Sequence, residues 1–381
     1  MNHPADGIFL LAAGRLPLGR YGGSLAGVGA VNLGLAAVQG LLADPALPRP
    51  GKVLWGMARS HTQGMNPART LALRAGLPFD TPAFTLNMAC GSSLQAAILA
   101  AQDLRAGAPA PILAGGSEAM SDTPHLLPGL RWGFRMGHRI LPDVMHQDGL
   151  RCPVTGLLMG ETIERLAAKR GILRADADAW AAESHRRAAA AHAETEWLPH
   201  PCLDHDECIR PGTSTRDLAL LPPVFDPTGQ VTAGNASALS DGAAALLLAR
   251  GDQLGTTPPL ARILGWSEAG VDPLDMGEAP VPAVRRLLAA HGLRVEDIAL
   301  WELNEAFAAQ LLVCQRQLDL PPDRLNVAGG AVALGHPIGA TGARIVVTLV
   351  HQLRQRGGGL GVATLGIGGG LGLALLVEVP A

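Results

Sequence analysis

The sequence is poor in aromatic and in charged side chains. Phe, Trp and Tyr make up 3% of the residues, and Asp, Glu, Lys and Arg make up 17%. With 30 basic against 33 acidic residues the formal net charge is −3, so no basic excess points to nucleic acid. The scarcity of aromatic rings also argues against a surface on which bases stack. We therefore expect no nucleic-acid partner.

Long apolar runs and a basic N-terminal segment are also missing. The apolar runs at 243–249 and 371–377 are far shorter than the roughly 20 residues that span a membrane. Residues 1–14 contain no Lys or Arg, which argues against a signal peptide. An odd number of cysteines without a framework spacing fits a reducing compartment. We predict a cytoplasmic protein without a membrane partner. The cysteines are Cys90, Cys152, Cys202, Cys208 and Cys314.

What is present indicates a globular α/β chain. The 381 residues correspond to roughly two to three domains of about 150 residues, and 48% hydrophobic content excludes a disordered chain. Residues 83–86 and 112–114 read as buried strands on either side of an alanine-rich helix at 92–106. Residues 121–233 differ, with proline-rich stretches around a long helical segment at 161–194. Strand and helix alternate again from about residue 260.

Two parts of the chain share one pattern. Near Cys90 a glycine-rich turn opens the helix at 92–106, and the strand at 112–114 then ends in Gly115 and Gly116. Near His336 a similar turn opens a helix at 341–355, and a strand at 362–365 ends in the glycines 368–370. The repetition predicts a duplicated βαβ-type unit.

Cys90 stands between a strand and the start of a helix. A helix N-terminus carries partial positive charge and unpaired N–H groups, which favour a thiolate, and the thiolate is the nucleophile. The alternative is a small buried hydrophobic side chain, since free cysteine often fills that role. Cys202, His205 and Cys208 form a C-x2-H-x2-C spacing, but the matching second half of a zinc site is missing. We expect no metal.

Two further polar sites lie in the C-terminal part. His336 lies on a glycine-rich turn before a helix, where a neutral imidazole base is plausible and a surface histidine is the alternative. Asn304 and Glu305 start an apolar segment. They fit either a helix N-cap with a first-turn carboxylate or an amide that orients water in an oxyanion hole.

Taken together, these motifs make the sequence resemble the thiolase family over nearly its whole length. No single motif is specific, but several in the right order are. They lie at 20–26, 66–69, 87–93, 114–121, 159–162, 232–237, 240–245, 304–307 and 329–342.

The resemblance implies a fold and an assembly. It predicts an α/β body of five layers, α/β/α/β/α, made of two similar halves with an inserted loop domain. We expect the N-terminal half at 1–120 plus 234–257, the loop domain at 121–233 and the C-terminal half at 258–381. Since family members are usually dimers or tetramers, we expect a homodimer or homotetramer.

The resemblance also implies a reaction on acyl-CoA thioesters, with coenzyme A as substrate or product and no permanently bound cofactor. Cys90 would take the acyl group while His336 activates its thiol. Asn304 would hold a water that forms one oxyanion hole with His336, and the N–H groups of Cys90 and Gly368 would form the other. The positions that match the CoA and acyl pocket are Met159, Ala233, Ser237 and Phe307, with Arg210 near the CoA nucleotide.

One departure from the family pattern concerns the chemistry. The C-terminal family motif normally reads Cys-x-Gly-Gly-Gly-x-Gly, whereas residues 366–372 read Gly-Ile-Gly-Gly-Gly-Leu-Gly. Gly366 therefore stands where the resemblance implies the second catalytic cysteine, which moves a proton at the α-carbon of acetyl-CoA. General acid–base groups contribute about 10²–10⁴-fold to a rate. Ser93 and Leu158 are smaller departures, where many relatives have Gly and His.

Three functions remain open from the sequence. The first is a thiolase-type acyltransferase whose ordinary thiolysis and condensation are weakened or altered by Gly366. The second is a decarboxylative condensing enzyme, because decarboxylation generates a carbanion without a proton-abstracting base. The third is a non-catalytic acyl-CoA-binding or scaffold subunit. The retention of Cys90, His336 and Asn304 favours an enzyme.

Overall fold

A computed structural model describes residues 5–191 and 193–381. Its main sheet has the strand order β4-β3-β5-β6-β1-β7-β10-β9-β8, and the short β2 (Gly19–Arg20) pairs with β6. The other strands are β1 (Ile8–Arg15), β3 (Lys52–Gly56), β4 (Ala83–Leu86), β5 (Ile112–Ala119), β6 (Ser240–Arg250), β7 (Ala261–Gly270), β8 (Leu300–Leu303), β9 (Gly359–Ile367) and β10 (Leu371–Val379). Residues 1–4 of the segment considered as a signal peptide lie outside the described residues.

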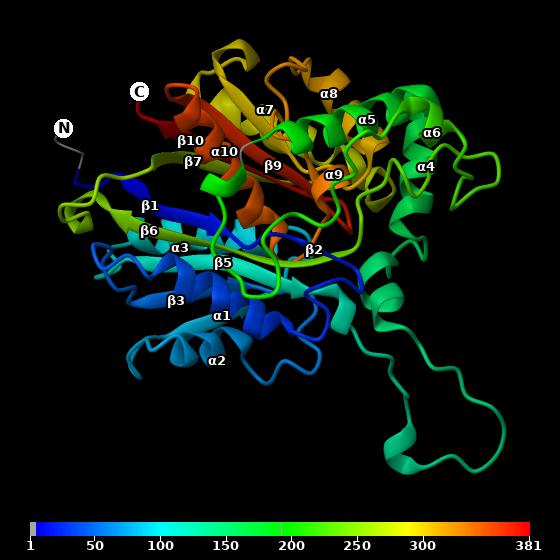
Figure 1. Cartoon of the computed structure of the whole chain (residues 1–381), viewed down its shortest axis with the longest axis horizontal. Helices are drawn as coiled ribbons and strands as arrows, with labels where there is room; N and C mark the ends of the chain where they lie inside the picture. The colour runs from blue at the N-terminus through cyan, green and yellow to red at the C-terminus, as the bar shows by residue number, and fades with distance from the viewer. Residues whose placement is uncertain (1–4, 192) are drawn as a thin grey trace.

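Ten α-helices surround these strands in the described part of the chain (Figure 1). They are α1 (Ala30–Leu41), α2 (Pro67–Arg74), α3 (Ser92–Arg105), α4 (Met159–Arg170), α5 (Arg174–Ala190), α6 (Thr215–Ala219), α7 (Pro280–His291), α8 (Ala308–Leu318), α9 (Ala331–Leu334) and α10 (Thr341–Gln355). The helices expected at 92–106 and 341–355 are confirmed as α3 and α10.

The two halves of the sheet repeat one topology. In the first half β3 runs parallel to β5, and β6 runs antiparallel to both β5 and β1. In the second half β8 runs parallel to β9, and β10 runs antiparallel to both β9 and β7. The parallel bridge between Trp301 and Leu325 takes the place that β4 has beside β3. The predicted duplication is therefore present in the strand pairing.

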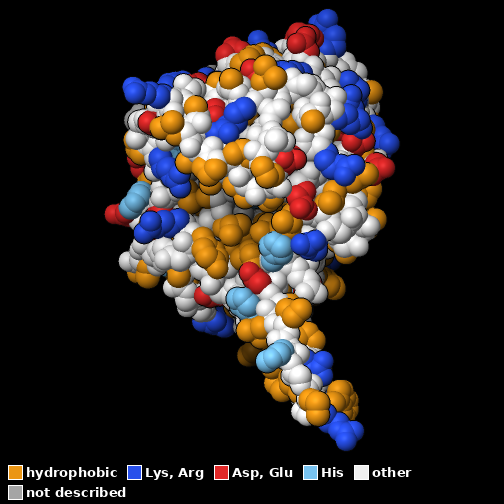
Figure 2. Space-filling model, turned by 90° about the vertical axis from the view of Figure 1, so that its right-hand side faces the viewer, with side chains coloured by type: hydrophobic (Ala, Val, Ile, Leu, Met, Phe, Trp, Pro, Cys, Tyr) orange, Lys and Arg blue, Asp and Glu red, His pale blue; other side chains and the backbone are white. Residues whose placement is uncertain are grey.

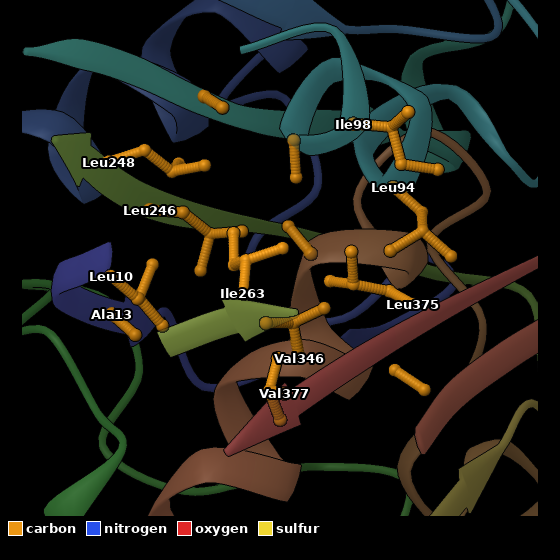
Figure 3. Close-up of a cluster of buried hydrophobic side chains, with 14 of the residues drawn as sticks. Leu10, Ala13, Leu94, Ile98, Leu246, Leu248, Ile263, Val346, Leu375 and Val377 are labelled. Carbon is orange, nitrogen blue, oxygen red and sulfur yellow. The ribbon is translucent and has the colours of Figure 1, made fainter. Parts of the chain in front are cut away.

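The strands inside the sheet, such as β5 and β6, are buried on both faces, which produces the layers. Along β6, Leu246 and Leu248 enter the central core while Leu247 and Ala249 enter the core beneath α1 and α2. The central core holds α3 and α10 between the two half-sheets (Figure 3). A third core joins α7 and α8 to the outer face of the second half-sheet. The order helix, sheet, helix, sheet, helix confirms the predicted fold class.

Two glycines predicted to end a strand lie inside it instead. β5 continues to Ala119, so Gly115 and Gly116 belong to the strand rather than to a turn. Their lack of a side chain is a packing requirement, because a Cβ on Gly115 would collide with Ala244 O and one on Gly116 with Gly339 O. The expectation of a turn at these glycines is wrong.

The segment between β5 and β6 carries an arm and three helices. The arm comprises residues 123–145 and is the long loop on the lower right of Figure 1, which returns to the body before α4. The predicted helical stretch at 161–194 is divided into α4 and α5, because Gly171 ends α4 in the left-handed conformation at φ 64°. Residue 192 of that stretch lies outside the described residues. None of the helices formed by residues 5–191 and 193–381 is long and apolar enough to cross a membrane.

The close approach of α3 and α10 gives a test of the central layer. A Cβ on Gly342 would overlap the backbone of Leu94, so Gly342→Ala forces the two helices apart. Overpacking of this kind costs typically 1–3 kcal/mol. We expect the free energy of unfolding, measured by urea denaturation, to fall by about 2 kcal/mol.

The matched control is Gly270→Ala on β7. Its Cβ would meet only Leu371 Cδ2, at 3.9 Å, and Gly270 is exposed. We expect an unchanged urea midpoint for this control. Equal stability of the two variants would contradict the account of the central layer.

Candidate active site

Cys90 lies on a tight turn between β4 and α3. Ala89, directly before it, has the left-handed φ of +46°, which is uncommon for a residue other than glycine. Asn87 Oδ1 accepts a hydrogen bond from Ala89 N–H at 2.9 Å. Ser92 Oγ accepts one from Met88 N–H at 2.9 Å and donates one to Ala89 O at 2.7 Å. These bonds hold the thiol just ahead of the first turn of α3.

The environment of the Cys90 thiol keeps it protonated at rest. Burial raises its pKa above the ordinary value. Hydrogen bonds from the N–H groups of Gly368 and of Cys90 itself, together with the charge of Arg59, act in the opposite direction without cancelling the rise. Two backbone donors therefore converge on the sulfur, and formation of a thiolate requires a base.

His336 has the protonation state of such a base. Burial, with the charges of Arg344 and Arg59, lowers the pKa of His336 to about 3, so the imidazole is neutral at pH 7. Thr341 Oγ1 donates to Pro337 O at 2.9 Å, and its lone pair faces His336 Nδ1 at 2.6 Å. Nδ1 therefore carries the proton and Nε2 carries the free lone pair. Nε2 is buried with no hydrogen-bond partner in the described part of the chain.

Asn304 presents an unused amide. It directly follows β8, its N–H donates to Thr364 O at 3.0 Å, and the residue is 1% exposed. Neither its Oδ1 nor its Nδ2 has a partner among residues 5–191 and 193–381. Because buried polar groups are nearly always satisfied, this amide indicates a position for a water or a ligand. The helix N-cap alternative is wrong, since α8 begins only at Ala308 with Phe307 as its N-cap.

The adjacent Glu305 has a structural role. Its carboxylate accepts hydrogen bonds from Trp180 Nε1, Ser184 Oγ, Asn326 Nδ2 and Val332 N at 2.8–3.1 Å. These donors come from α5 of the inserted segment and from the turns around α9. Glu305 thus fixes the backbone next to Asn304 without facing a substrate.

A direct bond joins the Cys90 side of the site to the His336 side. Ser93 Oγ, in the first turn of α3, accepts a hydrogen bond from Ala343 N–H in the first turn of α10 at 2.9 Å. Glu118 makes a second link, because its carboxylate accepts from Ala58 N–H and Gly339 N–H at 3.1 and 2.9 Å. Burial raises the pKa of Glu118 to about 7.

The predicted pocket residues fall into two groups. Met159 opens α4 and meets Gly368, since a Cβ on Gly368 would lie 3.2 Å from its sulfur. Ser237 N–H bonds to Ala306 O, next to Phe307, which packs edge-on against another ring, that of Phe225, with centroids 6.4 Å apart. The second group holds the two exposed residues, Ala233 and Arg210.

The position of Gly366 offers no acid or base. The atoms nearest to a Cβ built there are Met276 O at 3.1 Å and Pro280 Cδ at 3.4 Å. Cys314 is no substitute, because its thiol donates to Gly277 O at 3.1 Å and burial raises its pKa to about 12. The Cys152 sulfur accepts hydrogen bonds within its own turn, from Thr155 and from the backbone N–H of Val154.

The roles of Arg59, Glu118 and Thr341 were not predicted from the sequence. Thr341 had a usable signal, since a hydroxyl five residues after a histidine on a helix-opening turn can orient its ring. The sequence carried no signal for Arg59, because this residue lies in a polar stretch that is typical of a surface loop. The residues of the C-x2-H-x2-C spacing do not form a metal site within the described residues, where no group of three potential ligands occurs. His205 Nδ1 instead pairs with Asp204 Oδ1 at 2.7 Å.

Comparisons with known proteins agree with this geometry. The thiolase N-terminal domain model matches residues 8–252, and the thiolase C-terminal domain model matches residues 257–379. This chain belongs to the thiolase family. It is 46% identical to an acetyl-CoA acetyltransferase of Chromobacterium violaceum, over 98% of this chain and 100% of the relative. It is 42% identical to a probable acetyl-CoA acyltransferase of Staphylococcus aureus, over 97% and 98%.

Solved thiolase structures share the whole fold. The human mitochondrial 3-ketoacyl-CoA thiolase in complex with CoA has a TM-score of 0.95 at 38% identity and covers 98% of both chains. A thiolase of Ascaris suum in complex with coenzyme A has a TM-score of 0.94 at 36% identity, over 98% of this chain and 100% of that one. The expected class, an acyltransferase of the thiolase type, is confirmed by these relatives.

The tautomer of His336 can be tested through Thr341. Thr341→Val removes the acceptor of the Nδ1 proton, and an unsatisfied buried donor costs about 1–3 kcal/mol. We expect the free energy of unfolding to fall by that amount and alkylation of Cys90 by iodoacetamide at pH 7 to slow by about tenfold. Thr341→Ser keeps the hydroxyl and should resemble the wild type. A valine variant that matches the serine variant would contradict this assignment.

Proposed function

We propose that this chain transfers acyl groups from CoA thioesters through a covalent acyl-Cys90 intermediate. The observation that carries the proposal is that His336 Nε2 and the amide of Asn304 are buried with no hydrogen-bond partner among the described residues. Two backbone N–H groups, those of Cys90 and Gly368, also act on the Cys90 sulfur. Such a pair can stabilise the oxyanion of a tetrahedral intermediate formed at that sulfur. Coenzyme A would be a substrate or product and not a permanently bound cofactor.

In the first half-reaction His336 Nε2 takes the proton of the Cys90 thiol. The thiolate attacks the thioester carbonyl, and the N–H groups of Cys90 and Gly368 hold the resulting oxyanion. When the tetrahedral intermediate collapses, the carbon–sulfur bond to CoA breaks and the CoA thiolate takes the proton from His336. The acyl group is then a thioester of Cys90.

In the second half-reaction an acceptor attacks the acyl-Cys90 carbonyl and regenerates the thiol. We assign the amide of Asn304 to a water that forms a second oxyanion hole for the acceptor's thioester oxygen. His336 joins this hole once Nε2 has taken up a proton from the acceptor or from water, and it then gives that proton to the departing Cys90 thiolate. The absence of a partner on this buried amide within the described residues supports the assignment. We place the CoA and acyl pocket at Met159, Ala233, Ser237 and Phe307, and the CoA nucleotide near the exposed Arg210.

The glycine at position 366 favours a second half-reaction that does not depend on rapid removal of a proton from the acceptor's α-carbon. An ordinary condensation removes a proton from the α-carbon of the acceptor, and the atoms around Gly366 include neither an acid nor a base. We propose that this step is slow or that the acceptor gains its carbanion in another way. Loss of carbon dioxide from the acceptor is such a way, which keeps decarboxylative condensation as the second candidate.

We also propose a homo-oligomer, a dimer or tetramer. β4 is an edge strand that pairs only with β3 within the described sheet, and Phe84 on it is 50% exposed. The arm carries large exposed apolar side chains, among them Trp132 at 88% and Met136 at 90%. An unpaired strand edge and large exposed apolar side chains both favour an interface with a second copy. Localisation in the cytoplasm stays a prediction.

The covalent step can be tested by intact-mass spectrometry. On incubation with acetyl-, 3-oxoacyl- and malonyl-type CoA esters, we expect the wild-type mass to rise by one acyl group and Cys90→Ala to show no adduct. Cys202→Ala removes an exposed thiol away from the site and should keep the adduct. Binding of CoA esters without any adduct would overturn the proposal in favour of a non-catalytic acyl-CoA-binding subunit.

The role of position 366 can be tested by restoring a thiol. We expect Gly366→Cys to accelerate thiolysis of acetoacetyl-CoA by about 10²-fold or more, as a general acid–base group does. Gly366→Ala adds the same Cβ, 3.1 Å from Met276 O, without a thiol and should stay at the wild-type rate. A wild type as fast as the cysteine variant would show that the missing thiol has no consequence.

A further inference from the structure

Arg59 is a buried cation whose side chain makes no hydrogen bond within the described part of the chain. It follows β3 by three residues and is 5% exposed. None of its three side-chain nitrogens, Nε, Nη1 and Nη2, has a hydrogen-bond partner among residues 5–191 and 193–381. A guanidinium has five N–H donors, and leaving them all unused away from water is costly. The thiolase mechanism proposed above gives this side chain no task.

The packing around Arg59 holds the guanidinium in place. The space that a Cβ on Gly149 would need is filled by the Arg59 guanidinium. Gly149 has no positive φ, so accommodation of Arg59 is the reason the structure gives for a glycine there. The charge of Glu118 attracts the guanidinium, but the Glu118 carboxylate accepts hydrogen bonds from the backbone N–H groups of Ala58, Arg59 and Gly339 and leaves the side-chain donors of Arg59 unused.

Arg59 adjoins the apolar surface on which Cys90 lies. A small cluster of buried side chains contacts Cys90, and its members on either side of Arg59 are Ala58 and Leu150. Ala58 precedes Arg59 in the chain, and Leu150 follows Gly149. The charge of Arg59 acts on both Cys90 and His336. It adds to the lowering of the His336 pKa and opposes the rise that burial causes in the Cys90 pKa. The remaining members of the cluster are Met120, Met145, Ile338 and Leu239.

We propose that Arg59 binds a carboxylate on the acyl chain, so that the substrate is a CoA thioester of a dicarboxylic acid. The inference rests on the proposed function, because it places the acyl group on Cys90. The methylene groups of the chain would lie on the apolar cluster, and the free carboxylate would accept two hydrogen bonds from the guanidinium. Planar, paired donors match a carboxylate, and an apolar surround strengthens the pairing. Figure 2 shows a hollow lined by hydrophobic side chains above the root of the arm.

The test compares two thioesters of nearly equal shape. Succinyl-CoA carries a terminal carboxylate, and 4-methylpentanoyl-CoA carries an isopropyl group in its place. The rate of acylation of Cys90 by each is followed by intact-mass spectrometry in wild type, Arg59→Met and Arg59→Lys. A hydrogen-bonded charge pair of this kind is worth about tenfold to hundredfold. Arg131→Met, on the exposed arm, is the matched control.

We expect the wild type to react at least about tenfold faster with succinyl-CoA than with the neutral analogue. Arg59→Met should lose this preference, so that its two rates become nearly equal, and Arg59→Lys should keep part of it. The contrary outcomes are distinguishable. Equal wild-type rates with both thioesters would overturn the inference but leave the proposed function intact. Equal slowing of both reactions by Arg59→Met would assign a purely structural role. No adduct from any thioester would overturn the proposed function and this inference with it. Should Arg59→Met fail to fold, the wild-type pair and Arg59→Lys decide the matter.

Discussion

The hydrogen bond between Ser93 Oγ and Ala343 N–H is the contact on which the site depends. It joins the first turns of α3 and α10, the two helices of the central layer, and Gly342 allows their backbones to meet there. Cys90 precedes one of these turns and the His336 loop precedes the other. The proposed nucleophile and base come from different halves of the chain, so their relative position is only as well defined as this contact. The burial of both helices on all sides supplies the rigidity.

The buried polar groups of the site divide by whether they are satisfied. Glu305, Ser92 and Thr341 have their hydrogen bonds filled by protein and serve as supports. Asn304 and Nε2 of His336 have none filled by the described residues. A folded chain tolerates such groups where a substrate or water completes them, which is the pattern expected of a preorganised site. The stability lost at these positions is offset by the large apolar cores on both sides of each half-sheet.

Much of this arrangement was predictable from sequence because its signals are local. The glycine turns, the helices at α3 and α10 and the duplication follow from patterns spanning a few tens of residues. What escaped prediction depends on contacts between distant segments. Gly116 is a glycine because Gly339 O approaches it from the other half, and Arg59 is buried because residues of the inserted segment cover it. The separation of α4 from α5 was not predicted, because a left-handed glycine can end a helix without any change in the surrounding composition.

The repeated topology has a consequence for the origin of the fold. Each half contributes one helix to the central layer, and each of those helices is covered on one side by the other half. A shorter ancestral chain with one half alone would have exposed an apolar helix and one face of its sheet to water. Such a chain could bury them only against a second copy related by a twofold axis. The two halves of the present chain occupy the places that two such copies would take, which is the arrangement that duplication and fusion of one half would produce.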